Sequence, residues 1–219
     1  MGCPIDMLCK RGAGSALMNR PNKLEAVVRG ALTGIALGSH GRSRMPELTV
    51  KMRTGWDHRK TTAQGFVPMI QGLHEDVSYL SIRAQEQYKL QEQLSVAAVS
   101  IHGRSRLMRY TKTADWDYIG GAADARLSTD MALIGNGDVF TFSEFHDHLE
   151  DGKLETCMIG RGALIKPWIS TEIKERRHWD ISASERFDML KEFCNFGFEQ
   201  WGSDQRVRNS IMYLFTSLI

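Results

Sequence analysis

Cysteine is scarce in this sequence, and the cysteines that are present form no metal-binding pattern. The four are Cys3, Cys9, Cys157 and Cys194, with no Cys-x-x-Cys pair and no histidines at ligand spacing beside them. This pattern argues against the common structural zinc motifs. The start of the chain is polar and rich in glycine, unlike a secretory signal peptide. We therefore expect free thiols in a reducing compartment, the cytoplasm with the nucleus as a second location.

Net charge and long apolar runs are also missing. The 28 Lys and Arg residues are nearly balanced by 26 Asp and Glu residues, which leaves a formal net charge of +2. No global basic field therefore marks a nucleic-acid-binding protein, and any contact with RNA must come from local patches. No apolar run reaches the about 18 residues of a membrane-spanning helix. Hydrophobic residues still make up 42% of the 219 residues, so we expect a soluble protein with a packed core.

The chain does contain four short runs typical of β-strands. They are apolar or β-branched, and they lie at 48–53, 96–101, 131–134 and 156–159. Helical patterns precede, separate and follow these runs, at 15–37, over most of 60–94, at 142–149 and from 169 to the end. Pro21 lies near a helix start, and Thr141 or Ser143 would cap the helix at 142–149. The last pattern is interrupted at 179–182 and at Gly202. Residues 1–14 are expected to form a loop. This alternation of strands and helices predicts a parallel α/β architecture.

Two glycine-containing stretches refine the fold prediction. Residues 134–138 and 159–163 each follow an apolar run, as in the last two strands of a (β/α)8 barrel whose loops hold a phosphate. The predicted fold is therefore the C-terminal half of a (β/α)8 TIM barrel followed by a partial α-helical domain. We expect the barrel part, with the last four strands, to cover 1–168 and the helical domain to cover 169–219.

Polar or glycine residues close each predicted strand, in the order Lys51, His102, Asn136 and Gly160-Arg161. The carboxyl ends of the strands form the active-site face of a (β/α)8 barrel, so this order predicts a site there. Each residue alone has a plainer interpretation. Lys51 suits an ion pair with a neighbouring acid, His102 suits a hydrogen-bonded residue at the barrel rim, and Asn136-Gly137-Asp138 suits a turn.

Taken as a set, several stretches of the sequence resemble the tRNA-dihydrouridine synthase family, and within it the eukaryotic tRNA-dihydrouridine(47) synthases. The stretches that carry this resemblance are Met-Gly-Cys-Pro-Ile-Asp at 1–6, Cys-Lys-Arg-Gly-Ala-Gly at 9–14, Leu-Thr-Val-Lys-Met-Arg-Thr-Gly at 48–55, His-Gly-Arg-Ser-Arg at 102–106, Tyr-Thr-Lys at 110–112, Ala-Asp-Trp at 114–116, Gly-Asn-Gly-Asp at 135–138, Arg-Gly-Ala-Leu-Ile-Lys-Pro-Trp at 161–168, Glu-Ile-Lys-Glu at 172–175 and His-Trp-Asp-Ile-Ser at 178–182. The resemblance spans nearly all of the chain.

This resemblance implies a flavin enzyme that reduces a uridine in tRNA to 5,6-dihydrouridine, with FMN and NADPH as cofactors. By match to the Gly-Cys-Pro motif, Cys3 would protonate C5 of the uracil after hydride transfer to C6. A thiol with an ordinary pKa of about 8.5 is mostly protonated at neutral pH, as a general acid must be. Cys9 would be a structural or loop thiol, whereas Cys157 and Cys194 would lie in the core.

The resemblance also assigns the cofactor and tRNA contacts. Residues that would contact the flavin or its phosphate are Lys51, His102, Asn136, Gly137, Asp138, Gly160 and Arg161. Residues that would contact tRNA are Arg104, Arg106, Lys166 and Lys174, the last two within a basic cluster that also holds Arg176, Arg177 and His178 among Trp168 and Trp179. A solvated loop or a solvated helix face is the plainer interpretation of these basic residues.

The sequence also departs from the family pattern. No stretch corresponds to the family's first strands or to the asparagine that precedes Met-Gly-Cys-Pro, and Met108 stands where relatives carry glutamine. The chain therefore looks truncated at its N-terminus, and another chain or a missing segment would complete the barrel. We expect the chain alone to bind FMN weakly or not at all.

Two other functions compete with the tRNA-uridine reductase. One is a catalytically inactive fragment that acts as an RNA-binding or assembly module, with Cys3 idle. The other is an FMN barrel acting on a small molecule, because phosphate loops are shared across such folds. The Gly-Cys-Pro stretch and the helical tail argue against the small-molecule enzyme.

Overall fold

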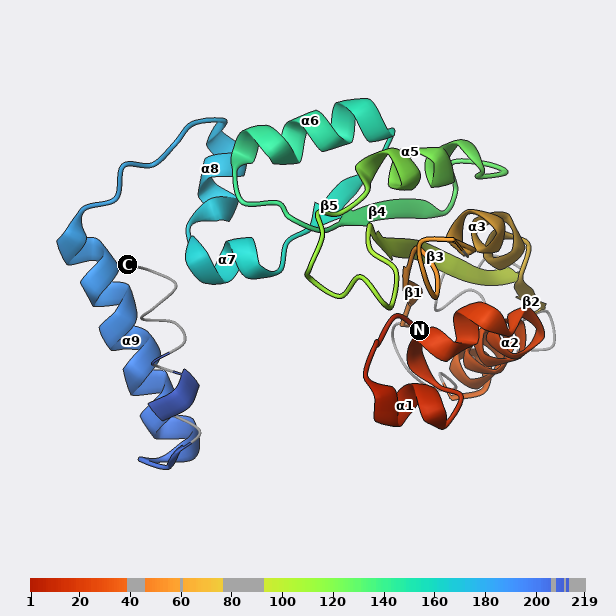
Figure 1. Ribbon diagram of the computed structural model, residues 1–219, viewed down its shortest axis with the longest axis horizontal. Helices are drawn as coiled ribbons and strands as arrows, with labels where there is room; N and C mark the ends of the chain where they lie inside the picture. Colours follow the sequence, from red (N-terminus) through yellow and green to blue (C-terminus); the bar gives the residue numbers. More distant parts are fainter. Residues whose placement is uncertain (39–45, 60, 77–92, 206–207, 211, 213–219) are drawn as a thin grey trace, which may run out of the picture. The chain divides into compact units, whose positions relative to one another are not determined.

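The computed structural model describes residues 1–38, 46–59, 61–76, 93–205, 208–210 and 212 (Figure 1). The chain divides into two compact units, Met1–Gly137 with His148–Met158, and Asp138–Asp147 with Ile159–Ile219. The domain boundary expected at residue 168 thus falls inside the second unit.

The first unit contains most of the strands. Its elements are α1 (Asp6–Lys10), the 3-10 helix η1 (Gly14–Asn19), α2 (Pro21–Gly38), β1 (Leu48–Arg53), α3 (Ala63–Gln71), β2 (His74–Asp76), β3 (Gln93–His102), α5 (Trp116–Asp124), β4 (Ala132–Asn136) and β5 (Thr156–Met158). Helix α6 (Phe142–Gly152) contributes residues to both units. The second unit also contains α7 (Arg161–Ile165), α8 (Ile169–Glu175) and α9 (Ala183–Trp201).

A parallel sheet in the order β1-β3-β4-β5 organises the first unit, and the short β2 pairs antiparallel with β3 (Figure 1). Residues that lie opposite each other in paired strands point to the same face. The register therefore separates an apolar face from a polar one. Val50, Met52, Val99, Ile101 and Leu133 lie on the apolar face and are nearly or fully buried.

Three helices cover the apolar face. Leu24, Val28 and Leu32 from α2 join the same buried cluster as these strand residues, as do Phe66 and Ile70 from α3. Helix α5 contributes a third set of buried side chains to the cluster. At about 25 cal/mol per Å² of apolar area removed from water, this cluster is the main stabilising feature of the first unit.

The opposite face of the sheet becomes polar toward the carboxyl ends of the strands. Lys51 lies opposite Ser100, and His102 lies opposite both Arg53 and Asn136. A parallel sheet with helices on one face and polar side chains at the strand ends of the other is the arrangement of part of a (β/α)8 barrel. The structure therefore agrees with the fold class predicted from the sequence.

The four predicted strands are confirmed as β1, β3, β4 and β5. The prediction of helix over most of 60–94 is right for α3. It is wrong at β2, where pairing with β3 overrides the local pattern. Residues 77–92 of that stretch lie outside the described residues. The loop predicted for 1–14 contains the short helix α1. The helix predicted from residue 15 starts only at Pro21, after η1, because proline suits the first position of a helix.

Helix starts in the second unit follow standard capping chemistry. Thr141 accepts a hydrogen bond from the Glu144 backbone at 3.2 Å, and the Glu144 carboxylate in turn accepts the backbone N–H of Thr141 at 2.9 Å. This confirms Thr141 as the cap of α6. Ser182 and Glu185 form the same reciprocal pair at the start of α9. Such pairs satisfy backbone donors that a helix leaves unpaired.

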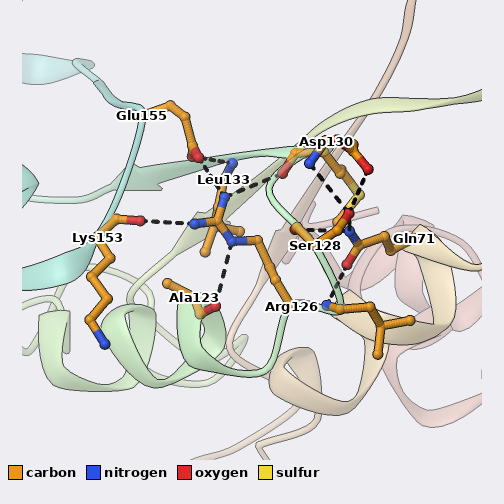
Figure 2. A network of polar contacts seen from close by, with 10 residues as sticks. Gln71, Ala123, Arg126, Ser128, Asp130, Leu133, Lys153 and Glu155 are labelled. Atoms are coloured by element: carbon orange, nitrogen blue, oxygen red, sulfur yellow. Dashed lines mark hydrogen bonds and ion pairs between the residues drawn. The ribbon is translucent and has the colours of Figure 1, made fainter.

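At the amino ends of β4 and β5, Arg126 ties three segments together (Figure 2). Its guanidinium donates to the Met131 carbonyl at 3.3 Å, to the Lys153 carbonyl at 3.1 Å and to the Glu155 carboxylate at 2.5 Å. Glu155 also accepts the Leu133 backbone N–H at 2.6 Å. These bonds connect the end of α5 with the starts of both strands. In such a barrel this end contributes to stability rather than catalysis.

Candidate functional site

The segment that carries Cys3 lies against the carboxyl end of β1. A Cβ atom on Gly2 would lie 3.2 Å from the backbone of Met52, so the glycine permits close approach to the strand. The Cys3 carbonyl accepts the Ser15 backbone N–H at 2.9 Å and the Cys9 thiol at 3.6 Å. The Cys3 side chain is partly exposed, whereas Cys9 is buried. Cys9 thus has the structural position expected from the sequence.

Gly14 holds the other side of the Cys3 backbone. Its φ of +58° lies in the left-handed region, and a Cβ there would lie 2.6 Å from the Cys3 carbonyl oxygen. Only glycine therefore combines this backbone conformation with this contact. The Cys-Lys-Arg-Gly-Ala-Gly stretch consequently fixes the position of Cys3.

Arg53 links Cys3 to the strand ends, a role that sequence reasoning missed. The residue is only 4% exposed, and its guanidinium donates to the Gly2 carbonyl at 3.1 Å and to the Ser105 carbonyl at 3.0 Å. Burial lowers the pKa of Arg53 from its ordinary value, although its interaction with Tyr110 opposes that effect. Arg53 also interacts electrostatically with Cys3. The signal in the sequence was a second basic residue, after Lys51, at the very end of the same strand.

Lys51 and Asn136 meet on the polar face. The Lys51 ammonium donates to Oδ1 of Asn136 at 2.7 Å, and Nδ2 of Asn136 donates to the Met158 carbonyl at 2.7 Å. The Asn136 amide is therefore held in one orientation, and it spans β4 and β5. This answers the question that the sequence left open, because the hydrogen-bond acceptor of the Lys51 ammonium is an amide and not an acid.

The pKa of Lys51 is lowered to about 8, first by desolvation from the protein atoms around the ammonium and then by the positive charge of Arg53. The residue as a whole still has solvent access, so its ammonium is crowded by protein without being sealed from water. Because the ammonium is already partly desolvated by the protein, it can donate to a further polar acceptor with little additional loss of hydration.

Ser100 lies between these residues on the same face, and it too was missed. It is opposite Lys51 in β1 and Ile134 in β4, and it is 5% exposed. Among the described residues, its hydroxyl is one of the buried side-chain groups with no hydrogen-bond partner. Burying a hydroxyl without a partner is unfavourable, so this position suits contact with a polar group laid over the face.

His102 is buried at the end of β3, beside Arg104. A nitrogen of Arg104 lies 3.3 Å from Nε2 of His102, and Arg104 also donates to the Lys112 carbonyl at 2.6 Å. Tyr110 lies near both side chains, with its ring centre 6.1 Å from that of His102. His102 therefore has a hydrogen-bonding neighbour at the barrel rim, and its predicted contact with a flavin stays a prediction.

The turn after β4 brings Gly137 beside His102. Gly137 has φ +133°, and a Cβ there would lie 2.5 Å from the Cβ of Ala114 and 3.3 Å from Cδ2 of His102. The structure therefore brings together Lys51, His102, Asn136 and Gly137 at the carboxyl edge of the first unit's sheet.

In the second unit, Asp138 and Arg161 form an ion pair of 2.8 Å. Arg161 also lies over the Phe140 ring, 5.7 Å from its centre. A Cβ on Gly162 would collide with the Val139 carbonyl, so this glycine permits close packing of α7 on that segment. Gly160 precedes α7 as its N-cap, and nothing described lies within 4 Å of a Cβ built on it.

The residues predicted to contact tRNA differ in their surroundings. Arg104 is 3% exposed, and Arg106 pairs with Asp6 while lying 4.2 Å over the Trp56 ring. Lys166 donates to the buried Glu172 at 2.6 Å, whereas Lys174 is exposed on α8. Contact of Arg104 or Lys166 with RNA would require these internal bonds to be exchanged. Their predicted contacts with tRNA stay predictions.

Two further predictions concern the remaining thiols. Cys157 is buried in β5, as expected, and burial raises the pKa of its thiol to about 12. Cys194 lies on α9 but is partly exposed, so the prediction of a core position was wrong. Its helix also leaves Phe187, Phe196 and Phe198 at least half exposed.

The described part of the chain shows no group of three or more His, Cys, Asp or Glu side chains arranged to hold a metal ion. None of its described helices is both long and apolar enough to cross a membrane.

Comparison with known proteins connects this geometry to one family. The sequence profile of the family described as Dihydrouridine synthase (Dus) matches residues 1–73 and 81–214. Similar proteins include the NAD(P)(+) tRNA-dihydrouridine(47) synthase-like proteins of Xenopus tropicalis, 41% identical over 204 residues, and of Homo sapiens, 42% identical over 204 residues. The tRNA-dihydrouridine(47) synthase of Malassezia globosa is 39% identical over 226 residues.

These alignments cover 93% of this chain for the Xenopus and human proteins and 95% for the Malassezia protein. The chain spans only 27% of the Xenopus protein and 26% of the other two. The profile match nevertheless covers most of the chain, including the Cys3 segment and the strand ends that carry Lys51, His102 and Asn136. On that match, the chain belongs to the dihydrouridine synthase family.

Proposed function

We propose that this chain is the part of a tRNA-dihydrouridine synthase that supplies the catalytic acid and the carboxyl ends of the last four barrel strands, which would line one side of a flavin site. The observation that carries the proposal is that the Cys3 segment lies against the carboxyl end of β1, at the sheet edge that also holds Lys51, His102 and Asn136, in a member of this family. The substrate would be a uridine in tRNA, and the product 5,6-dihydrouridine.

The residues of the polar face fit a flavin. Lys51 and the unpaired hydroxyl of Ser100 are donors suited to carbonyl or ring-nitrogen acceptors of a planar ring. Gly137 would let the backbone of its turn approach the ribityl phosphate, with Asn136 and Asp138 beside it. His102 would contact the flavin or its phosphate end, and Gly160 and Arg161 would complete the phosphate contacts.

The chemistry that a bound FMN, reduced by NADPH, would supply here is a hydride for C6 of the uracil. The remaining step belongs to Cys3, whose thiol gives its proton to C5 and is left as a thiolate until solvent returns a proton. Arg53 would place a positive charge near this position, because its guanidinium donates to the carbonyl of the preceding residue, Gly2. The bonds from Ser15 and Cys9 to the Cys3 carbonyl hold the thiol in position for this transfer.

A base in folded tRNA must leave its stack to reach such a site. The exposed basic residues of α8 and the segment after it, with Lys174 and Arg176 among them, would bind the tRNA backbone. Arg104, Arg106 and Lys166 would join only where RNA phosphates replace their internal partners. We place this reaction in the cytoplasm, with the nucleus as a second location.

An inactive RNA-binding or assembly module is the second candidate. It is favoured by the sheet edges of β1 and β5, because each pairs on one side only among the described residues. Another chain or a further segment of a longer protein would then complete the barrel. In that function Cys3 would have no chemical role.

Flavin retention and tRNA reduction test the proposal. The purified chain is incubated with FMN and desalted, and flavin absorbance is recorded; dihydrouridine formation is then measured with tRNA, FMN and NADPH. Where the chain retains flavin and forms dihydrouridine, Cys3→Ala should abolish dihydrouridine formation while leaving bound flavin unchanged, whereas Cys194→Ser should change neither. Dihydrouridine formation at the wild-type rate by Cys3→Ala would refute the role of Cys3. A folded chain that binds tRNA without flavin or activity would support the inactive module instead.

A further inference from the structure

The segment Ala114–Asp115–Trp116 packs against the carboxyl ends of β3 and β4. The Asp115 backbone N–H donates to the Gly103 carbonyl at 2.6 Å, and a Cβ on Gly103 would lie 2.8 Å from the Asp115 nitrogen. Asp115 also caps α5, because its side chain accepts the Tyr118 backbone N–H at 2.8 Å. The position of Trp116, the first residue of that helix, is therefore fixed by its neighbours.

The Trp116 ring fills the space that glycine leaves at position 135. A Cβ on Gly135 would collide with the edge of the indole and would lie 2.8 Å from Leu154. On the other side, the indole stacks on His148, with ring centres 3.6 Å apart and an interplanar angle of 11°. Trp116 is thus held between the end of β4 and α6, and its orientation is determined by packing.

This orientation directs the indole N–H at the turn after β4. Nε1 of Trp116 donates to the Gly137 carbonyl at 3.1 Å. In a trans peptide the carbonyl and the following N–H point in opposite directions. Fixing the Gly137 carbonyl on the indole therefore turns the N–H of the same peptide unit, which belongs to Asp138, away from Trp116. Gly137 and Asp138 both have a positive φ, of +133° and +50°. The turn therefore has few other backbone conformations that keep this hydrogen bond.

We propose that Trp116 is a positioning residue for the phosphate end of the cofactor. Through the Gly137 carbonyl it sets the orientation of the Gly137–Asp138 peptide in the turn where the phosphate would bind, and it would do so without touching the cofactor. This inference rests on the proposed function, because it requires a flavin nucleotide phosphate at the turn.

Comparison of FMN with riboflavin separates this role from a structural one, because riboflavin has the same ring without the phosphate. The affinity of the full chain for each flavin is measured by quenching of flavin fluorescence. Trp116→Phe keeps an aromatic ring on His148 and removes the N–H. It should weaken FMN binding about threefold to tenfold, as expected for one hydrogen bond, and weaken riboflavin binding less than about twofold. Trp56→Phe, a matched substitution in the same unit whose ring lies under Arg106, should change neither affinity.

Gly135→Ala provides a second variant, which should disturb the same turn through the position of the Trp116 ring. Its methyl group displaces the indole and should reduce the preference for FMN in the same way. Combined with Trp116→Phe, whose smaller ring lacks the colliding atoms, the alanine should cause no further loss of that preference.

The outcomes distinguish the two proposals. If wild type prefers FMN and Trp116→Phe keeps the same ratio of FMN to riboflavin affinity, the positioning role is wrong and the flavin site stands. If wild type binds the two flavins equally, or binds neither, the phosphate assignment in the proposed function fails for this chain, and the role of Trp116 fails with it.

Discussion

At the scale of single residues, the polar face of the sheet contains a lysine with unusual titration. Desolvation and Arg53 lower the pKa of Lys51 to about 8. In the unfolded chain its pKa returns to the ordinary 10.5. Between about pH 8 and 10.5 the unfolded state therefore binds more protons, so this residue makes stability rise with pH across that window. Below pH 8 its charge is present in both states, and its contribution is constant and unfavourable.

Lys51 should consequently react early with an amine-directed reagent. We expect peptide mass spectrometry after brief acetylation at pH 8.5 to show Lys51 modified ahead of the chain's other accessible lysines, with a rate profile whose midpoint lies near pH 8. Asn136→Ala removes the acceptor of its hydrogen bond and should shift that midpoint further down. A midpoint near the ordinary pKa of 10.5 would contradict the expected crowding of the ammonium.

The thiols provide a second residue-scale prediction. Burial in β5 raises the pKa of Cys157 to about 12, so almost no thiolate is present at neutral pH. Cys3 is partly exposed. Iodoacetamide at pH 7.5 should therefore alkylate Cys3 in the native chain at least about tenfold faster than Cys157, and denaturant should remove the difference. Equal native rates would show that β5 does not bury its cysteine.

At the scale of elements, Arg126 should be a main stabilising contact of the first unit. Its side chain is 9% exposed, and it bonds to two backbone carbonyls and to Glu155 (Figure 2). Arg126→Met leaves these acceptors unsatisfied and should lower the free energy of unfolding by about 2–3 kcal/mol. Arg29→Met removes an exposed pair with Glu25 and should cost less than about 0.5 kcal/mol. Denaturant titration of both variants measures the difference, and equal effects would refute a special role for Arg126.

Glu172 plays a comparable part in the second unit. Its side chain is 1% exposed and accepts the Lys166 ammonium at 2.6 Å, the Trp168 indole at 3.2 Å and the Trp179 backbone N–H at 3.1 Å. Burial alone would raise the pKa of Glu172, but these hydrogen bonds outweigh it and lower the pKa. A carboxylate with a lowered pKa stabilises the fold above its unfolded pKa of about 4.3, and that contribution is lost as the pH falls through the folded value.

Glu172→Gln should therefore destabilise the second unit by about 2–4 kcal/mol at pH 7, because an amide cannot accept all three donors and leaves Lys166 without its counter-charge. The loss should shrink toward pH 3. The control is Glu175→Gln on the same helix, whose pair with Arg177 is exposed and should contribute less than about 0.5 kcal/mol. Limited proteolysis within 159–205 provides the readout, and resistance unchanged by Glu172→Gln would count against this network.

The strands of the sheet and the residues at their ends show which parts of the structure could be predicted from the sequence. Strand patterns and the order of residues at the strand ends predicted the sheet and the placing of Lys51 and Asn136 at its carboxyl edge, because both follow from local periodicity and parallel topology. Arg53, Ser100 and Trp116 were missed. Their importance depends on which distant backbone group lies opposite: the Gly2 carbonyl for Arg53, and the Gly137 carbonyl for Trp116. The strand β2 was missed for the same reason, since its three polar residues form a strand only beside β3.

At the scale of the whole molecule, the two outer strands of the sheet decide how the chain behaves in solution. Among the described residues, β1 and β5 each have a parallel partner on one side only. An open edge presents backbone N–H and C=O groups that pair readily with another strand. The polar face beside these edges also carries the exposed Met158. Other copies of the chain are the available partners in a purified sample.

The purified chain should therefore self-associate. Size-exclusion chromatography with light scattering should give a mass above the 24.8 kDa of one chain, rising with concentration in the micromolar range. A lysine on the β5 edge, Thr156→Lys, should lower that mass because charge on an edge strand opposes pairing. Thr111→Lys, an exposed position in the loop after β3, should not. If the wild type stays monomeric across this range, the open edges do not drive association. If both variants lower the mass equally, added positive charge explains the change and edge pairing does not.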